Sequence, residues 1–194
     1  DILGLPDWAR PLVMMGDSVN YMKGGIESSN VVITVSETYS HEILDPFFSY
    51  GLDSILSERV YKLHGVVNGI DETIFDPAKD NKIFANYSIK NYKSKKKENK
   101  ENLLKMIDLP YDEKRPLIAM VSRLTEQKGF DLFAAVIDDI MRADVNVVVL
   151  GTGDWKYENM VSSVEERYPN KFRAIKAFSG DMASKLYAAS DIFL

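Results

Sequence analysis

The chain has 194 residues, of which 45% are hydrophobic, and it carries a formal net charge of −5. This length suits one large domain or two partial ones and can bury a sizeable core, while the negative balance argues against nucleic acid as a partner. The absence of cysteine excludes disulfides and thiolate metal sites and is typical of a reducing, cytoplasmic compartment. The absence of any run of about 18 apolar residues excludes a transmembrane helix, so we expect no membrane partner.

The first part of the chain follows a helix–strand–helix order. Residues 1–10 are expected to be irregular because glycine and proline interrupt them, and they lack the basic start and long apolar stretch of a signal peptide. The expected elements are a helix over 20–28, a strand over 31–35 and a helix over 37–44. The strand is β-branched throughout, which is typical of a strand buried on both faces. Ser36 is placed to cap the second helix and Pro46 to end it, and residues 47–65 show no clear period.

The pair Asn68-Gly69 is a strong turn signal. It could close a hairpin, or it could form an exposed corner between two domains. No strand of matching length follows, and Phe75-Asp76-Pro77 continues as loop, so we favour the corner.

A lysine-rich stretch covers residues 93–100, where five of eight residues are lysine. It could be a basic patch for phosphate or a polyanion, or the solvated N-terminal face of a helix that continues to Ile107. We favour the solvated face, because no aromatic residues are interleaved as in a surface that stacks on nucleic-acid bases.

From residue 115 onward the pattern becomes regular. Strands are expected over 116–121, 145–150, 172–177 and from 192, and helices over 130–142, 156–168 and 181–189. Strands that alternate with helices predict a parallel sheet with right-handed crossovers. The fold class is therefore α/β, with a Rossmann-like parallel sheet and helices on both faces, and residues 115–194 form about half of such a domain.

Both ends of the chain suggest an internal part of a longer protein. The sequence does not begin with methionine, and it stops at Ser190–Leu194 in what reads as the first residues of a buried strand. An interrupted sheet has open apolar edges, so we expect self-association of the isolated chain.

The stretch Ile118–Leu132 organises the second half of the chain. A short apolar strand leads into Ser122 and Arg123, a tight polar loop carries Lys128, and an amphipathic helix follows. Ligands of parallel α/β sheets bind beyond the carboxyl ends of the strands. Two cations there, beside a helix N-terminus, predict an anion site that suits phosphate. The residues by themselves allow solvated loop cations equally well.

The pair Gly151-x-Gly153 follows a predicted strand and precedes a predicted helix. A dinucleotide fingerprint needs a third glycine where this chain has Lys156, which argues against NAD. The glycines could allow close approach of a ligand to the backbone, or simply form a tight turn. Neither His41 nor His64 belongs to a metal motif or to a recognisable catalytic set.

Several stretches together resemble one family. They are Val19–Ile26, Val32–Ile43, Gly65–Asp71, Val121–Leu132 and Leu150–Asp154, and their order and spacing fit along nearly the whole chain. In these the chain resembles the bacterial glycogen synthases and plant starch synthases. These are retaining glycosyltransferases with two Rossmann-like domains, the GT-B architecture.

The resemblance implies an activity and a domain plan. Such enzymes transfer glucose from ADP-glucose to the non-reducing end of an α-1,4-glucan, so the expected partners are ADP-glucose or ADP and a glucan acceptor, with no further cofactor and no metal. Residues 1–65 are then the end of an N-terminal, acceptor-side domain. Residues 66–114 form the crossing between domains with a lead-in helix, and residues 115–194 the first half of a C-terminal domain that binds the nucleotide sugar.

The resemblance also assigns site residues. Arg123 and Lys128 match the cations that bind the donor diphosphate, where they would neutralise charge on the leaving ADP. Ser122 lies beside them, and Gly151 and Gly153 match the glycine turn next to the nucleotide. Phe178 aligns with a position beside the adenine, where an aromatic face could stack, although a core phenylalanine is the alternative.

Other segments of the family pattern are not found in the chain. These are a Lys-Thr-Gly-Gly type loop, a histidine near the transferred sugar and a Glu-Pro-Cys-Gly type segment. The chain alone is therefore expected to be catalytically inactive and to act as a nucleotide-binding or assembly piece. A related glycosyltransferase that uses UDP-glucose is a further alternative, because an arginine followed by a nearby lysine recurs widely in that fold.

Overall fold

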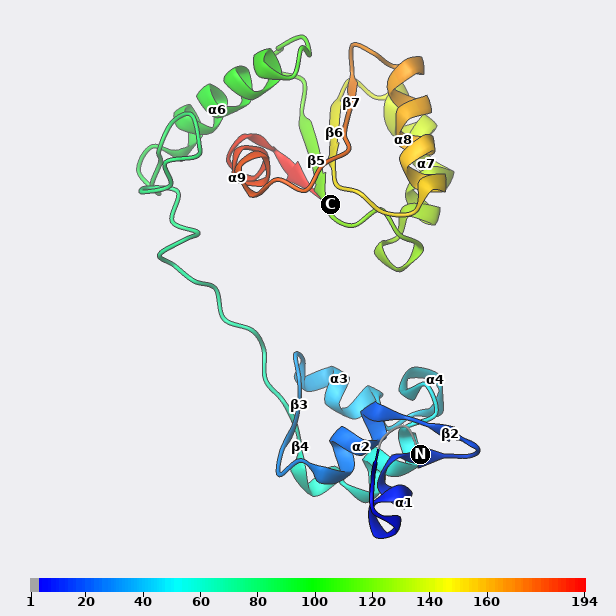
Figure 1. Cartoon of the computed structure of the whole chain (residues 1–194). Coiled ribbons are helices and arrows are strands. Elements are labelled where there is room, and N and C mark those ends of the chain that lie inside the picture. Colours follow the sequence, from blue (N-terminus) through cyan, green and yellow to red (C-terminus); the bar gives the residue numbers. More distant parts are fainter. Residues whose placement is uncertain (1–3) are drawn as a thin grey trace. The chain divides into compact units, whose positions relative to one another are not determined.

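The computed structural model describes residues 4–194, which divide into two compact units at Ile70/Asp71 (Figure 1). The prediction for residues 1–3 lies outside the described residues. Between residues 4 and 194, no helix is both long and apolar enough to cross a membrane.

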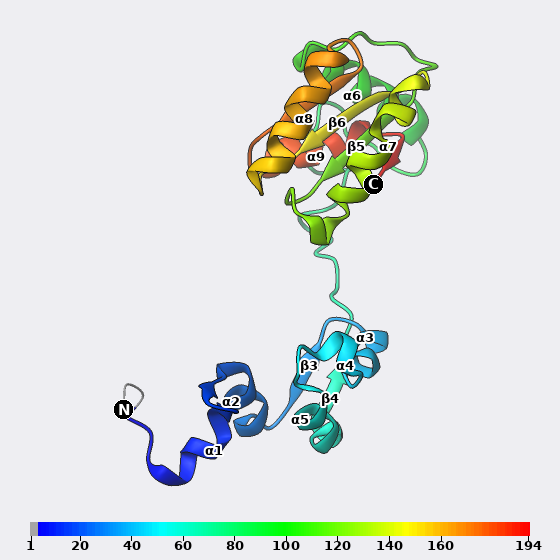
Figure 2. The same cartoon turned by 90° about the vertical axis from the view of Figure 1, so that its right-hand side faces the viewer.

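The first unit is small and consists of short elements (Figure 2). Its helices are α1 (Arg10–Val13), α2 (Tyr21–Ser28), α3 (Glu37–Glu42), α4 (Pro46–Ser49) and α5 (Asp53–Glu58), and 3-10 turns lie at Asp7–Ala9 and Val60–Lys62. Its strands are β1 (Met14–Met15), β2 (Ser18–Val19), β3 (Val32–Thr34) and β4 (Leu63–Gly65). The prediction that residues 1–10 are irregular is wrong for residues 7–10, where a 3-10 turn leads into α1. The antiparallel pair β1–β2 further along the chain was not predicted.

Two helix starts in this unit follow from side-chain caps. The Asn20 side chain accepts a hydrogen bond from Lys23 N, and the Ser36 hydroxyl accepts one from Tyr39 N. Each satisfies a backbone donor that a helix leaves free in its first turn. The predicted helices at these positions and the cap at Ser36 are therefore confirmed.

The expectation that the strand around residues 31–35 is buried on both faces is wrong. Strand β3 pairs in parallel with β4, and Thr34 is buried, but Val31, Ile33 and Val35 are more than half exposed. Side chains alternate between the two faces of a strand, so one face packs on the small core and the other is open within the part of the chain that the structure describes. The core of this unit consists of Ile26, Ile43, Leu56 and Leu63.

The second unit contains a four-stranded sheet in the order β7-β6-β5-β8, with all neighbouring strands parallel. Its strands are β5 (Leu117–Val121), β6 (Asn146–Leu150), β7 (Phe172–Ile175) and β8 (Ile192–Phe193). Its helices are α6 (Tyr92–Met106), α7 (Phe130–Arg142), α8 (Trp155–Arg167) and α9 (Gly180–Ala189), with a 3-10 turn at Glu126–Lys128. Counted along the chain, this is the order 3-2-1-4 of half a Rossmann sheet, which confirms the predicted fold class.

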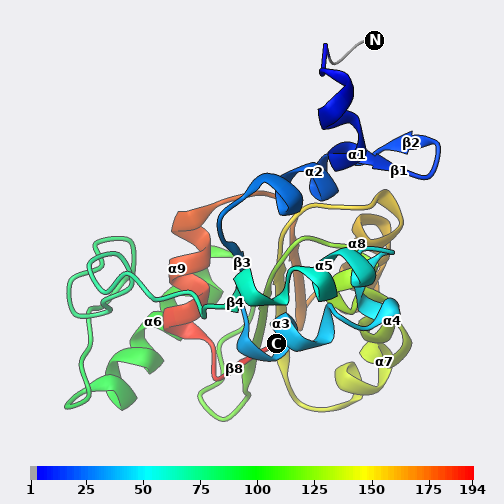
Figure 3. The ribbon, with the colours of Figure 1, turned by 90° about the horizontal axis from the view of Figure 1, so that it is seen from below.

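Helices cover both faces of this sheet (Figures 1 and 3). On one face α7 and α8 pack against β5, β6 and β7, and the core there includes Phe130, Phe133, Tyr157, Val161 and Phe172. On the other face α6 and α9 lie side by side and bury Leu103, Leu104, Leu117 and Leu186. Apolar burial on two faces explains why β5 and β6 read as continuous hydrophobic runs.

The segment Asp71–Asn91, all of which is described, joins the first unit to α6 without a helix or strand of its own. No hairpin forms at Asn68-Gly69, because β4 ends at Gly65 and β5 begins only at Leu117. The fully buried side chain of Asn99 on α6 fastens this segment. Its Oδ1 accepts hydrogen bonds from Phe84 N and Ala85 N, and its Nδ2 donates to Ala85 O.

The lysine-rich stretch forms the first half of α6, but it is not simply a solvated face. Lys96 Nζ donates to Tyr187 O and Ala188 O at the C-terminal end of α9. Lys100 is buried, where its Nζ lies 2.7 Å from both Asp191 Oδ2 and Arg115 O. Both lysines therefore bind α6 to its neighbours. The expectation of a solvated face is wrong for them, because their partners lie about ninety residues along the chain.

Candidate functional site

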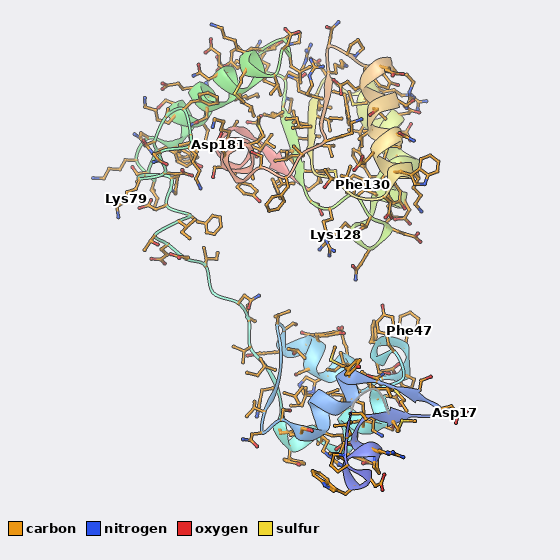
Figure 4. The ribbon with its side chains drawn as sticks, in the orientation of Figure 1. Asp17, Phe47, Lys79, Lys128, Phe130 and Asp181 are labelled. Carbon is orange, nitrogen blue, oxygen red and sulfur yellow. The ribbon has the colours of Figure 1, made fainter. Side chains whose placement is uncertain are left out.

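The predicted anion loop follows β5 as a compact turn. Lys128 N donates to Thr125 O and Gly129 N to Glu126 O, which closes the 3-10 turn. Gly129 then adopts φ 75°, a left-handed conformation that glycine tolerates without strain, and α7 begins at the fully buried Phe130. Figure 4 labels Lys128 on this loop and Phe130 at the start of the helix. A buried anchor and a tight turn thus hold the exposed Lys128 near a helix N-terminus.

The loops after β5 and β6 lie against each other, backbone to backbone. Ser122 N donates to Leu150 O, Leu124 N to Thr152 O and Asp154 N to Leu124 O. These bonds continue the parallel pairing of the two strands beyond their ends, as far as a bridge between Leu124 and Gly153. The two loops therefore form one backbone framework at the carboxyl edge of the sheet.

Gly151 and Gly153 are required by this loop contact. A Cβ atom on Gly151 would lie 1.8 Å from Ser122 O, and one on Gly153 would lie 2.3 Å from Leu124 O. Gly151 also has φ 157°, a conformation that residues with side chains rarely adopt. Both glycines thus make the tight approach of two protein segments possible, which is the simpler of the two readings of the Gly-x-Gly pattern.

A cavity of about 390 Å³ opens beside this framework, at the carboxyl ends of β5 and β6. It lies within the second unit. Its walls come from the segment after Asp71, from the two loops and from α9, and they are formed by Ile74, Phe75, Lys82, Val121, Ser122, Arg123, Leu150, Gly151, Thr152, Ala177, Phe178, Ser179, Gly180, Ala183, Ser184 and Tyr187. This is the position where ligands of open α/β sheets bind.

The structure brings four of the six predicted site residues together in this cavity. They are Ser122, Arg123, Gly151 and Phe178. Lys128 and Gly153 do not line it. Lys128 lies on the neighbouring 3-10 turn, and Gly153 lies in close contact with the backbone of Leu124. Phe178 is fully exposed at the cavity, so the alternative of a core phenylalanine is wrong.

The charge of the lining has one sign. Among the residues that the structure describes, those lining the cavity include Arg123 and Lys82 but no aspartate or glutamate. The N-terminal end of α9 adds partial positive charge, since Ser179 and Gly180 border the cavity. Apolar walls, exposed aromatic rings and uncompensated cations suit a ligand with an aromatic base and an anionic group.

Sequence reasoning missed the wall that precedes α6. Ile74, Phe75 and Lys82 come from the segment Asp71–Asn91, which reads only as loop. Tyr187 and Ser184 come from a face of α9 that reads as an ordinary helix. No local pattern marks these residues, because their proximity to Arg123 depends on chain segments that are distant in sequence.

A larger cavity of about 620 Å³ lies at the opposite, amino-terminal edge of the sheet. Its walls include Glu101, Lys105, Asp108 and Arg173, so it is mixed in charge. Arg173 is already occupied, because it donates to Glu165 and to the carbonyl oxygens of Ile107 and Asp108 at the end of α6. This arrangement binds a helix end to the sheet, so Arg173 is not available to a ligand there.

Residues 4–194 contain no group of three histidine, aspartate or glutamate side chains that could hold a metal ion.

Comparisons with known proteins find similarity to glycosyltransferases. The family model described as starch synthase catalytic domain matches residues 1–58, and the one described as glycosyl transferases group 1 matches residues 101–194. A glycogen synthase from Clostridium acetobutylicum is 46% identical over 92% of this chain and 37% of its own length. One from Clostridioides difficile is 44% identical over the whole chain and 41% of its own length.

Solved structures agree with these matches. The catalytic domain of starch synthase IV from Arabidopsis thaliana, bound to ADP and acarbose, matches 98% of this chain and 40% of its own chain, with a TM-score of 0.89 and 31% identity. HepE from Anabaena in complex with UDP, at 13% identity and a TM-score of 0.52, shares the fold alone. The chain thus spans about two fifths of the length of the relatives that it matches.

Proposed function

Because the chain belongs to the family of the glycogen and starch synthases, we propose that it is part of an enzyme that transfers glucose from ADP-glucose to the non-reducing end of an α-1,4-glucan with retention of configuration. The observation that carries this proposal is the cavity at the carboxyl edge of the sheet, where Arg123 meets exposed aromatic side chains without any carboxylate in the lining. The ADP bound to the Arabidopsis starch synthase is a ligand of this chemical kind.

The proposed role of Arg123 follows from the charge that develops during transfer. When the bond between glucose and the diphosphate breaks, negative charge accumulates on the leaving ADP. A guanidinium can donate two parallel hydrogen bonds to phosphate oxygens and stabilise that charge. Lys128, on the adjoining turn, acts as a point charge that reaches the same diphosphate.

The remaining lining residues position the nucleotide. Phe178 is fully exposed, so its ring is free to stack on adenine. Ser122 lies at the end of β5 beside Arg123, and Gly151 keeps the neighbouring loop close enough to shape the cavity floor. Since side chains and a helix end supply the positive charge, we propose a reaction without a metal or other cofactor. We also propose that the protein acts in the cytoplasm.

The test uses the longer protein that contains this chain. With ADP-glucose and glycogen it should release ADP, and Arg123→Ala should lower kcat/KM by about a hundredfold to a thousandfold. Arg142→Ala is the matched control, because Arg142 pairs with Asp139 at the far end of α7 and does not line the cavity. Strict use of UDP-glucose would refute the assignment of ADP-glucose as the donor. Near-normal activity of Arg123→Ala would refute the assignment of Arg123 to the diphosphate.

A further inference from the structure

The segment Asp71–Asn91 places a second cation in the nucleotide cavity. Lys82 and Arg123 are the charged side chains among the described residues that line it. The chain as a whole has more acidic than basic residues, 29 against 24, yet no acid balances these two. Two like charges in a mostly apolar cavity repel each other, so the cavity is predisposed to bind an anion.

Lys82 has no ionic partner among residues 4–194, unlike several other lysines of the second unit. Lys79 pairs with Asp76, Lys97 with Glu113 and Lys100 with Asp191. Lys82 Nζ forms no ion pair or hydrogen bond with any residue from 4 to 194. The nearby Asp80 uses its Oδ1 to accept a hydrogen bond from the backbone N of Lys82 at 2.9 Å. The ammonium of Lys82 is thus available to a ligand.

The backbone that carries Lys82 is held on both sides. Asn86 Nδ2 donates to Pro77 O and Asp80 O, at 3.0 and 2.7 Å, which closes the loop that contains Lys82. Two residues beyond Lys82, the buried Asn99 side chain binds the backbone of Phe84 and Ala85. The lysine therefore projects from an ordered segment, which reduces the entropy lost when its side chain binds a ligand.

We propose that Lys82 binds a phosphate of the nucleotide in this cavity together with Arg123. This inference rests on the proposed function, since it concerns the same site, and it adds a residue from outside the predicted anion loop. Lys82 belongs to the segment that directly follows the first unit, whereas Arg123 lies in the loop after β5, at the carboxyl edge of the sheet. Phosphate binding would thus link that segment to the carboxyl edge of the sheet.

The experiment is titration calorimetry of the 194-residue chain with ADP and with adenosine, which lacks phosphate. Lys82→Met should weaken ADP binding about tenfold or more and leave adenosine binding within about twofold. Lys82→Arg should retain most of the ADP affinity. Lys79→Met is the matched control and should change neither affinity, because Lys79 lies in the same segment but not in the cavity.

The possible failures are distinguishable. If the wild-type chain binds ADP and Lys82→Met binds it equally well, the role of Lys82 is refuted while the proposed function stands. Equal losses for ADP and adenosine would also refute it, because they indicate a change in cavity shape rather than a lost phosphate contact. If the wild-type chain binds neither ligand, the assignment of the cavity itself is overturned.

Discussion

Replacing Gly151 by alanine tests the backbone framework on which the candidate site is built. The new Cβ would lie 1.8 Å from Ser122 O and 3.0 Å from Ser122 C. These are backbone atoms, so no side-chain rotation relieves the overlap. The two loops would have to separate by about another 1 Å or more, which weakens the bond from Ser122 N to Leu150 O and displaces Arg123 next to it.

The magnitude follows from two contributions. Overpacking of a close backbone contact costs about 1–3 kcal/mol, and a side chain at φ 157° adds about 1 kcal/mol or more of backbone strain. We therefore expect Gly151→Ala to lower the free energy of unfolding of the second unit by about 2–4 kcal/mol. ADP affinity should fall with it, because Ser122 and Arg123 move.

The assay is urea unfolding followed by the fluorescence of Trp155, in a Trp8→Phe background so that the signal reports on α8. Gly180→Ala is the matched control: Gly180 lines the same cavity, but a Cβ there has no atom within 4 Å. It should change stability by less than about 0.5 kcal/mol. If Gly151→Ala were as stable as this control, the reasoning about the loop contact would be refuted.

Two further predictions concern the lysines of α6. Asp191→Ala leaves the buried ammonium of Lys100 without its counter-charge and should lower the free energy of unfolding by about 2–3 kcal/mol, which is below the usual range for buried pairs because Asp191 is 44% exposed. Asp144→Ala removes the surface pair with Arg115 and should lower the free energy of unfolding by less than about 1 kcal/mol. Equal losses for the two variants would contradict the argument. Burial lowers the pKa of Lys96 from 10.5. Just below pH 10.5 the unfolded chain therefore binds more protons than the folded chain. The free energy of unfolding of the wild type, relative to that of Lys96→Met, should rise as the pH approaches 10.5. A difference in urea midpoint that does not change with pH would contradict this.

The fold of the second unit was predictable because its signals are local. The run at Leu117–Val121 is apolar over its whole length, β6 is apolar after the polar Asn146, and the helices between strands keep a clear period. In the first unit, β4 is only three residues long, and no pattern distinguishes it from the apolar residues before it. The exposed face of β3 was missed because the sequence shows which residues are β-branched but not what lies against them.

The candidate site was predictable where its residues follow a strand end. Arg123 and Gly151 come directly after β5 and β6, and the carboxyl edge of a parallel sheet brings such positions together. Lys82 precedes Arg123 by an entire helix and strand and has no local motif. Lys128 belongs to the predicted motif but lies outside the cavity, since the 3-10 turn carries it past the end of β5.

The buried side chain of Asn99 makes an irregular segment part of the cooperative structure of the second unit. Amide protons of loops usually exchange with solvent through local fluctuations that leave the rest of the fold intact. Those of Phe84 and Ala85 instead bind Asn99 Oδ1, and α6 positions that oxygen. Their exchange requires α6 to unfold or to separate from them, so these two loop amides should be protected to the same degree as the helix.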